Sequence, residues 1–198
     1  APGNMGSQKA TRFVSGRPFL QIPGPTLVPE RVVRAMSQPL IDHRGPKFAA
    51  LLKEVLEGLK GIFQTREGQI VLYPGSGTGA WEACVVNTLS AGDRVLGCVN
   101  GHFSTLFCHA AASFGIQVES LEVPYGVGIP AEQVEERLRS DTNRYIKAVL
   151  VVHNETSTGV ASNIAAIRRA VECAAHPALL LVVGVSWLAS IEFCFVEG

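Results

Sequence analysis

Residues 69–82 decide the fold: Gln69-Ile70-Val71-Leu72-Tyr73, then Pro74-Gly75-Ser76-Gly77-Thr78-Gly79-Ala80-Trp81-Glu82. The first five predict a strand, and the stretch from Ala80 to Leu89 predicts a helix. The first N–H groups of a helix lack intrahelical partners, and the helix dipole favours negative charge there. Glycines let the backbone approach a phosphate, and Ser76 and Thr78 add hydroxyl donors. The motif therefore predicts a phosphorylated cofactor or ligand; a tight turn that binds nothing is the alternative.

Apolar strands and helices alternate on the C-terminal side of this turn. The predicted strands are 69–73, 94–99, 116–123, 146–152 and 178–183. The predicted helices between them are 79–89, 103–114, 130–140 and 163–175. Several strands are continuous apolar runs, as expected when helices cover both faces of a mainly parallel sheet. The pattern predicts an α/β fold of this kind.

The residues before the turn predict an arm and two more helices. Pro18, Pro23 and Pro25 exclude a long helix from residues 1–28, which we expect to be extended. Pro29 opens a predicted short helix over 29–37. A longer helix is predicted over 46–64, with apolar residues at the spacing of one buried face. These are Phe48, Leu51, Leu52, Val55, Leu56, Leu59, Ile62 and Phe63. We therefore expect an arm, 1–28, and one large domain, 29–198.

Composition argues against several classes of function. Lys and Arg number 17, Asp and Glu number 17, and no long basic run occurs, so nucleic acid is not an expected partner. The five cysteines form no C-x-x-C pair, so no metal site is predicted. We expect a cytoplasmic protein with reduced thiols, an organelle being the open alternative. The uncharged stretch 178–191 is shorter than the roughly 20 residues that span a bilayer, so no membrane contact is expected.

Three polar segments directly follow predicted strands. They are Ser76–Thr78, Asn100–Phe103 and His153–Gly159. Because ligands of parallel sheets bind outside the carboxyl ends of the strands, these segments predict one site at that edge. For the third segment, an ordinary solvated loop is the alternative.

Five segments together resemble the class V, fold type I aminotransferases, which use pyridoxal phosphate. The chain is most similar to the serine–glyoxylate and alanine–glyoxylate aminotransferases in this group. The segments are 19–25, FLQIPGP; 41–46, IDHRGP; 76–83, SGTGAWEA; 87–93, NTLSAGD; and 153–159, HNETSTG. The resemblance implies the large, cofactor-binding domain of that fold, preceded by the arm and without the C-terminal part.

The resemblance also implies roles for individual residues. Pyridoxal 5'-phosphate would be held at its phosphate by Ser76, Gly77 and Thr78. Phe103 would stack on the pyridine ring, an ordinary core phenylalanine being the alternative. Thr156 would donate to the phenolic-oxygen side of the cofactor. Gly24 would lie over the substrate carboxylate.

Two departures from the family pattern stand out. The lysine that forms the Schiff base in the family has no match among Lys9, Lys47, Lys53, Lys60 and Lys147, and we expect it to lie beyond residue 198. Val183 stands where the family has an aspartate that pairs with the ring nitrogen.

The implied activity is transfer of an amino group from serine or alanine to glyoxylate, by a homodimer acting on small amino acids and 2-oxo acids. This chain is expected to be an incomplete or inactive form. One alternative is a non-catalytic fragment that associates with a full-length subunit. Another is an NAD-dependent dehydrogenase, because Gly75-x-Gly77-x-x-Ala80 fits a loose dinucleotide fingerprint. Against the latter, the next strand ends at Asn100 instead of an acidic residue.

Overall fold

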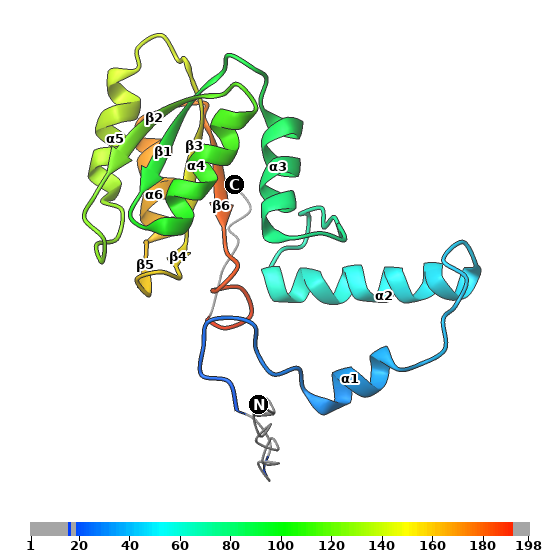
Figure 1. The fold of residues 1–198 in the computed structure, drawn as a ribbon. Helices are drawn as coiled ribbons and strands as arrows, with labels where there is room; N and C mark the ends of the chain where they lie inside the picture. The colour runs from blue at the N-terminus through cyan, green and yellow to red at the C-terminus, as the bar shows by residue number, and fades with distance from the viewer. Residues whose placement is uncertain (1–15, 17–18, 192–198) are drawn as a thin grey trace, which may run out of the picture. The chain divides into compact units, whose positions relative to one another are not determined.

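Parallel strands form the central sheet, and among the described residues their order is β2-β1-β3-β6 (Figure 1). The computed structural model describes residue 16 and residues 19–191. The strands are β1 (Arg94–Val99), β2 (Gln117–Glu122), β3 (Ile146–Val152) and β6 (Leu179–Val183). β1 pairs with β2 and β3, and β3 pairs with β6, in parallel register throughout. The predicted α/β class with a mainly parallel sheet is therefore confirmed.

Helices cover both faces of this sheet, and β3 shows why. Ala148 and Leu150 pack in one apolar cluster with side chains of α3 (Gly77–Thr88) and α4 (His102–Ser113). Val149 and Val151 pack in a second cluster with side chains of α5 (Ala131–Ser140) and α6 (Ile164–Cys173). Since successive side chains of a strand point to opposite faces, a continuous apolar run serves both clusters.

A short hairpin follows β3 at the carboxyl edge of the sheet. β4 (Asn154–Glu155) pairs antiparallel with β5 (Val160–Ala161). Gly159 closes the loop with φ of 74°, a left-handed conformation that favours glycine. The hairpin brings the polar segment 153–159 back over the end of β3, where the sequence predicted a site.

The prediction of a strand at 69–73 is wrong. These residues have no regular secondary structure and pair with no strand of the described chain. Val71 is 83% exposed and Tyr73 is 63% exposed. A strand forms only when a neighbour supplies hydrogen bonds, and apolar composition alone cannot reveal whether that neighbour exists.

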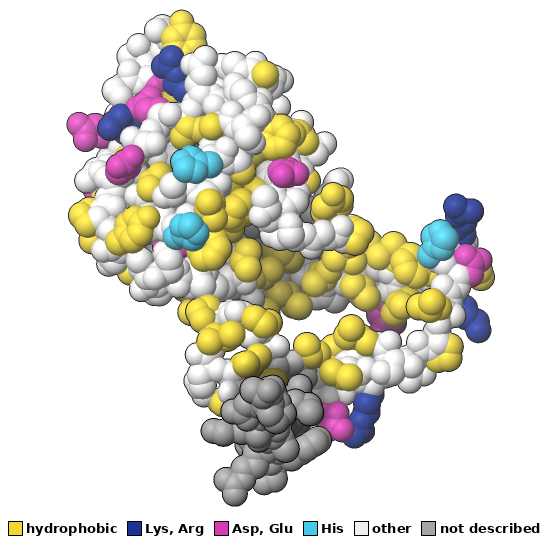
Figure 2. All heavy atoms as spheres, in the orientation of Figure 1, with side chains coloured by type: hydrophobic (Ala, Val, Ile, Leu, Met, Phe, Trp, Pro, Cys, Tyr) yellow, Lys and Arg dark blue, Asp and Glu magenta, His cyan; other side chains and the backbone are white. Residues whose placement is uncertain are grey.

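The predicted helix at 46–64 forms as α2 (Pro46–Phe63), but none of its residues is fully buried. Leu52, Leu56 and Leu59 are half-buried, whereas Leu51 and Val55 are exposed. Apolar side chains of α2 are visible on the surface in Figure 2. The periodicity predicted the helix, but the expectation of a buried face was wrong because too few apolar side chains of the described residues cover it.

Residues 1–40 and 41–198 form two separate compact units. In the described part of the first unit, α1 (Glu30–Met36) begins directly after Pro29 and carries an ion pair between Arg34 and Glu30 at 2.6 Å. The second unit contains the sheet and the helices α2 to α6. The boundary between arm and domain that we expected after residue 28 stays a prediction.

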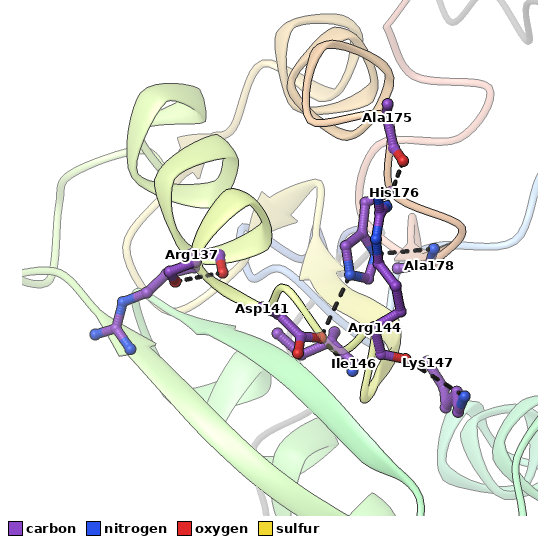
Figure 3. A network of polar contacts seen from close by, with 9 residues as sticks. Arg137, Asp141, Arg144, Ile146, Lys147, Ala175, His176 and Ala178 are labelled. Carbon is purple, nitrogen blue, oxygen red and sulfur yellow. Dashed lines mark hydrogen bonds and ion pairs between the residues drawn. The ribbon is translucent and has the colours of Figure 1, made fainter.

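A polar network joins the turns at the edge of the sheet opposite the hairpin (Figure 3). Asp141 Oδ2 accepts a hydrogen bond from Ile146 N at 2.7 Å and lies 3.3 Å from His176 Nε2. The amide of Ala178 donates to His176 Nδ1 at 3.2 Å, so the ring proton that faces Asp141 is on Nε2. Arg144 donates to the carbonyl oxygen of Ala175. The network ties the turn before β3 to the turn before β6.

Candidate functional site

The N-terminus of α3 is open on the side where the sequence predicted an anion. Ser76 is the N-cap, and its Oγ accepts a hydrogen bond from Gly79 N at 3.2 Å. Among the described residues, no atom accepts from the N–H groups of Gly77 and Thr78. A Cβ placed on Gly77 would meet only Val185 Cγ2, at 4.0 Å. A helix start can bind an anion when its first N–H groups are exposed and lie beside open space, and α3 meets both conditions.

The N-terminus of α4, in contrast, is filled by a protein carboxylate. Phe103 N donates to Glu155 Oε1 at 3.2 Å, and Ser104 N donates to Glu155 Oε2 at 3.0 Å. His102 N donates to Ser157 Oγ at 3.1 Å. Ser157 also donates to Glu155 Oε1, from Oγ at 2.7 Å and from N at 3.2 Å. The hairpin after β3 thus supplies the capping groups that a local N-cap residue normally provides.

Glu155 is fully buried, and its surroundings are shaped for it. Burial alone raises the pKa of the carboxyl, but the hydrogen bonds from Ser104 N, Ser157 and Phe103 N outweigh this, so the pKa of Glu155 lies below its usual value. A Cβ on Gly101 would overlap Glu155 Cγ, so this glycine is required by close approach. This role of Glu155 was not predicted from the sequence. The available signal was an acidic residue three positions after the apolar run 148–152.

Phe103 and Val183, both predicted near a cofactor ring, lie on one face of the sheet. Both are half-buried and pack against the cluster that contains Trp81 and Phe107. Val183 O accepts a hydrogen bond from His153 N at 2.9 Å, which continues the pairing of β3 with β6. The side chain of Val183 offers no charge at this position.

Thr156 is bonded to the loop that follows β6. Its Oγ1 donates to Ser186 Oγ at 2.8 Å, and Asn154 Nδ2 donates to the same oxygen at 2.8 Å. Beside this contact the rings of His153 and Trp187 stack, with centroids 3.9 Å apart and planes at 26°. Burial lowers the pKa of His153, so the stacked imidazole is neutral at pH 7. The structure thus brings Thr156 into contact with Ser186, three residues after Val183, the last residue of β6.

Gly24 and the lysines belong to other segments of the chain. Gly24 belongs to the first unit, so its role in substrate binding stays a prediction. Lys147 lies in β3 near its first residue, at the edge opposite the hairpin, and its Nζ donates to Arg144 O at 3.5 Å. Lys47, Lys53 and Lys60 lie in α2.

The described residues also bear on two other classes of site. No group of three or more His, Cys, Asp or Glu side chains there could hold a metal ion. No described helix is both long and apolar enough to cross a membrane.

Comparison with known proteins gives consistent matches. The family model described as "Aminotransferase class-V" matches residues 19–193. The serine–glyoxylate aminotransferase of Methylorubrum extorquens is 49% identical over 90% of this chain and 44% of the relative. The L-aspartate–glyoxylate aminotransferase of Paracoccus denitrificans is 48% identical over 87% of this chain and 43% of the relative. A solved alanine–glyoxylate aminotransferase from Nostoc sp. has a TM-score of 0.82 at 27% identity, covering 98% of this chain and 50% of that one. The chain thus spans less than half the length of these two curated relatives.

Proposed function

Since the chain belongs to the class V aminotransferase family, we propose that it is the cofactor-binding part of a glyoxylate aminotransferase. The family implies pyridoxal 5'-phosphate as the cofactor. The match covers the glycine turn on which the dehydrogenase alternative depended, so that alternative is set aside. The observation that carries the proposal is the contrast between two helix starts at one sheet edge. The start of α3 is open, whereas the start of α4 is filled by Glu155.

The residues present fit the phosphate of this cofactor. The N–H groups of Gly77 and Thr78 and the hydroxyls of Ser76 and Thr78 form a donor set without a carboxylate. The space beside Gly77 is the volume that a Cβ would fill. We infer that these residues bind the phosphate and so place the rest of the cofactor toward Phe103 and Val183.

The ring-binding residues fit in part. Bound pyridoxal phosphate supplies an electron-withdrawing ring that stabilises negative charge at the substrate Cα. Phe103 offers a flat apolar face for that ring, and Thr156 offers a hydroxyl. Val183 cannot hold a proton at the ring nitrogen, so this chain gives the ring less electrostatic support than a carboxylate would.

For the whole protein, we propose amino-group transfer from a small amino acid such as serine or alanine to glyoxylate. The support is the names of the relatives, which include serine, aspartate and alanine as amino donors. A homodimer and a cytoplasmic location are further proposals from the sequence. We propose that none of the lysines in this chain binds the cofactor covalently. A fragment that only associates with a full-length subunit is the alternative.

Titration of the chain with pyridoxal phosphate and, separately, with pyridoxal tests the phosphate site. We expect the phosphorylated compound to bind at least about tenfold more tightly, equivalent to about 1.4 kcal/mol. Gly77→Val places a side chain in the open space, so we expect it to remove this preference while the domain stays folded. Gly58→Ala is the matched control, because nothing lies within 4 Å of a Cβ at that position of α2. Equal binding of both compounds by the natural chain would contradict the proposal.

A further inference from the structure

Glu155 connects the two segments that carry the proposed ring-binding residues. Its carboxylate accepts from the backbone N–H groups of Phe103 and Ser104 in α4. The next residue in its own hairpin is Thr156, whose hydroxyl bonds Ser186 after β6. We propose that Glu155 is a positioning residue of the cofactor site, which fixes Phe103 relative to Thr156. This inference rests on the proposed function.

The contact depends on a carboxylate in particular. Both oxygens accept: Oε1 takes Phe103 N and Ser157, and Oε2 takes Ser104 N. A glutamine side chain has the same length, but its amide nitrogen would face a backbone N–H in one of the two positions. One donor would then lose its partner in a buried site, and the start of α4 would shift with the ring of Phe103.

The buried carboxylate also decides which helix start is free for a phosphate. At α4 the first-turn donors are occupied, and the negative charge of Glu155 repels a second anion. At α3 the described residues supply no such charge. Glu155 thus occupies the donors at the start of α4 that a phosphate would need there.

The test compares Glu155→Gln with Glu132→Gln, a matched change at an exposed position of α5. Calorimetry on the full 198-residue chain measures the Kd of pyridoxal phosphate and of inorganic phosphate. If Glu155 positions the ring-binding residues, Glu155→Gln weakens pyridoxal phosphate about tenfold and leaves inorganic phosphate unchanged. Amide hydrogen exchange at Phe103 and Ser104 accelerates in the same variant. Glu132→Gln changes none of these quantities.

The possible outcomes separate this inference from the proposed function. Failure of the natural chain to bind either compound overturns the proposed function itself. If the natural chain binds both compounds and Glu155→Gln leaves the ratio of their two Kd values unchanged, only the positioning role is overturned. If Glu155→Gln does not fold, Ser157→Ala serves as the test variant, because it removes the hydroxyl between His102 N and Glu155. A loss of affinity for pyridoxal phosphate that is smaller than tenfold, with unchanged affinity for inorganic phosphate, supports the positioning role. An unchanged ratio in Ser157→Ala overturns it.

Discussion

At the scale of single residues, Gly77 and Gly101 show how similar sequence signals acquire different roles. Each lies at the start of a helix that follows a small polar segment. Gly77 has open space beside its Cα, whereas Gly101 is in contact with Glu155. The difference arises because Glu155, which accepts from the first N–H groups of α4, lies 52 residues after Phe103 and 51 after Ser104 in the chain. A local pattern cannot show such a contact, so the sequence predicted both segments as parts of a site without separating them.

Val183→Asp is expected to destabilise the free chain more than the chain with bound pyridoxal phosphate. Val183 is half-buried against an apolar cluster, so a carboxylate there lowers the free energy of unfolding by about 1–3 kcal/mol. With pyridoxal phosphate present, the new carboxylate pairs with the ring nitrogen, so most of that loss is recovered. Urea unfolding with and without the cofactor measures both effects. Val182→Asp, on the neighbouring residue, is the control; recovery there as well would contradict the assignment of Val183.

The cysteines are expected to differ sharply in reactivity. Burial raises the pKa of Cys98 to about 12 and that of Cys108 to about 11, whereas Cys173 is exposed. Because the thiolate is the reactive form, iodoacetamide at pH 7.5 should label Cys173 and leave Cys98 and Cys108 unmodified in the native chain. Mass spectrometry locates the label, and a sample in urea shows that all sites can react. Equal native labelling of Cys98 and Cys173 would contradict the packing of β1.

At the scale of secondary structure, the accuracy of the sequence predictions follows the range of the interactions. Helices were predicted to within a few residues because caps and periodicity are local; the helix predicted from 79 begins at Gly77, after its cap Ser76. The four strands of the sheet were predicted correctly. For β1 and β3 the signal was the apolar run that burial on both faces leaves, whereas β2, at the edge, has polar residues between its apolar ones. Residues 69–73 have the same composition but no partner in the described chain, and composition does not report pairing.

Asp141→Asn tests the network at the opposite edge of the sheet. The variant keeps an acceptor for Ile146 N but weakens the contact with His176, so we expect a loss of about 1–3 kcal/mol in urea unfolding. Glu172→Gln, in an exposed ion pair with Arg168, should cost less than about 0.5 kcal/mol.

The same network predicts a pH dependence. Burial raises the pKa of Asp141, but hydrogen bonds from Ile146 N and His176 outweigh it, so the folded pKa lies below the usual value. A depressed pKa stabilises the fold above the unfolded value of about 3.9 and loses that contribution as the pH falls through the folded value. Natural chain and Asp141→Asn should therefore converge in stability toward pH 3. A constant difference from pH 7 to pH 3 would argue against an ionised Asp141.

At the scale of the whole molecule, each unit exposes several large apolar side chains. In the second unit, Leu51 of α2 is 49% exposed, Ile62 is 43% exposed and Leu72 is 50% exposed. In the first unit, Phe19 is 74% exposed and Ile22 is 49% exposed. Several exposed apolar side chains on one helix, such as Leu51, Val55 and Ile62 on α2, are typical of surfaces that bind other protein segments.

We expect the chain to associate in solution. Sedimentation at micromolar concentration should give a mass above the 21.1 kDa of the monomer, and dilution should lower it. The double variant Leu51→Ser, Val55→Ser removes part of the exposed face of α2 and should reduce association. Lys53→Ser is the control, since it changes the same helix without removing apolar area. A sedimentation mass of 21.1 kDa that does not change with concentration would contradict this expectation.

Reduction with borohydride in the presence of pyridoxal phosphate tests whether the chain holds a cofactor-binding lysine. We expect no single lysine to be labelled stoichiometrically, because Lys147 lies near the start of β3 and Lys47, Lys53 and Lys60 lie on α2. Lys9 lies outside the described residues. Weak labelling spread over exposed lysines is the expected result in peptide mapping. One dominant labelled lysine would show that this chain supplies the covalent partner itself.

The strand order β2-β1-β3-β6 also constrains how the sheet is assembled during synthesis. Of the four described strands of the sheet, β1 emerges from the ribosome first, and β2 joins one of its sides. β3 then joins the other side of β1, and β6 joins β3. Every later strand therefore attaches to a border that is still unoccupied, and no pair already made has to open to admit it. A chain released from its N-terminus onward can build this sheet by outward growth alone.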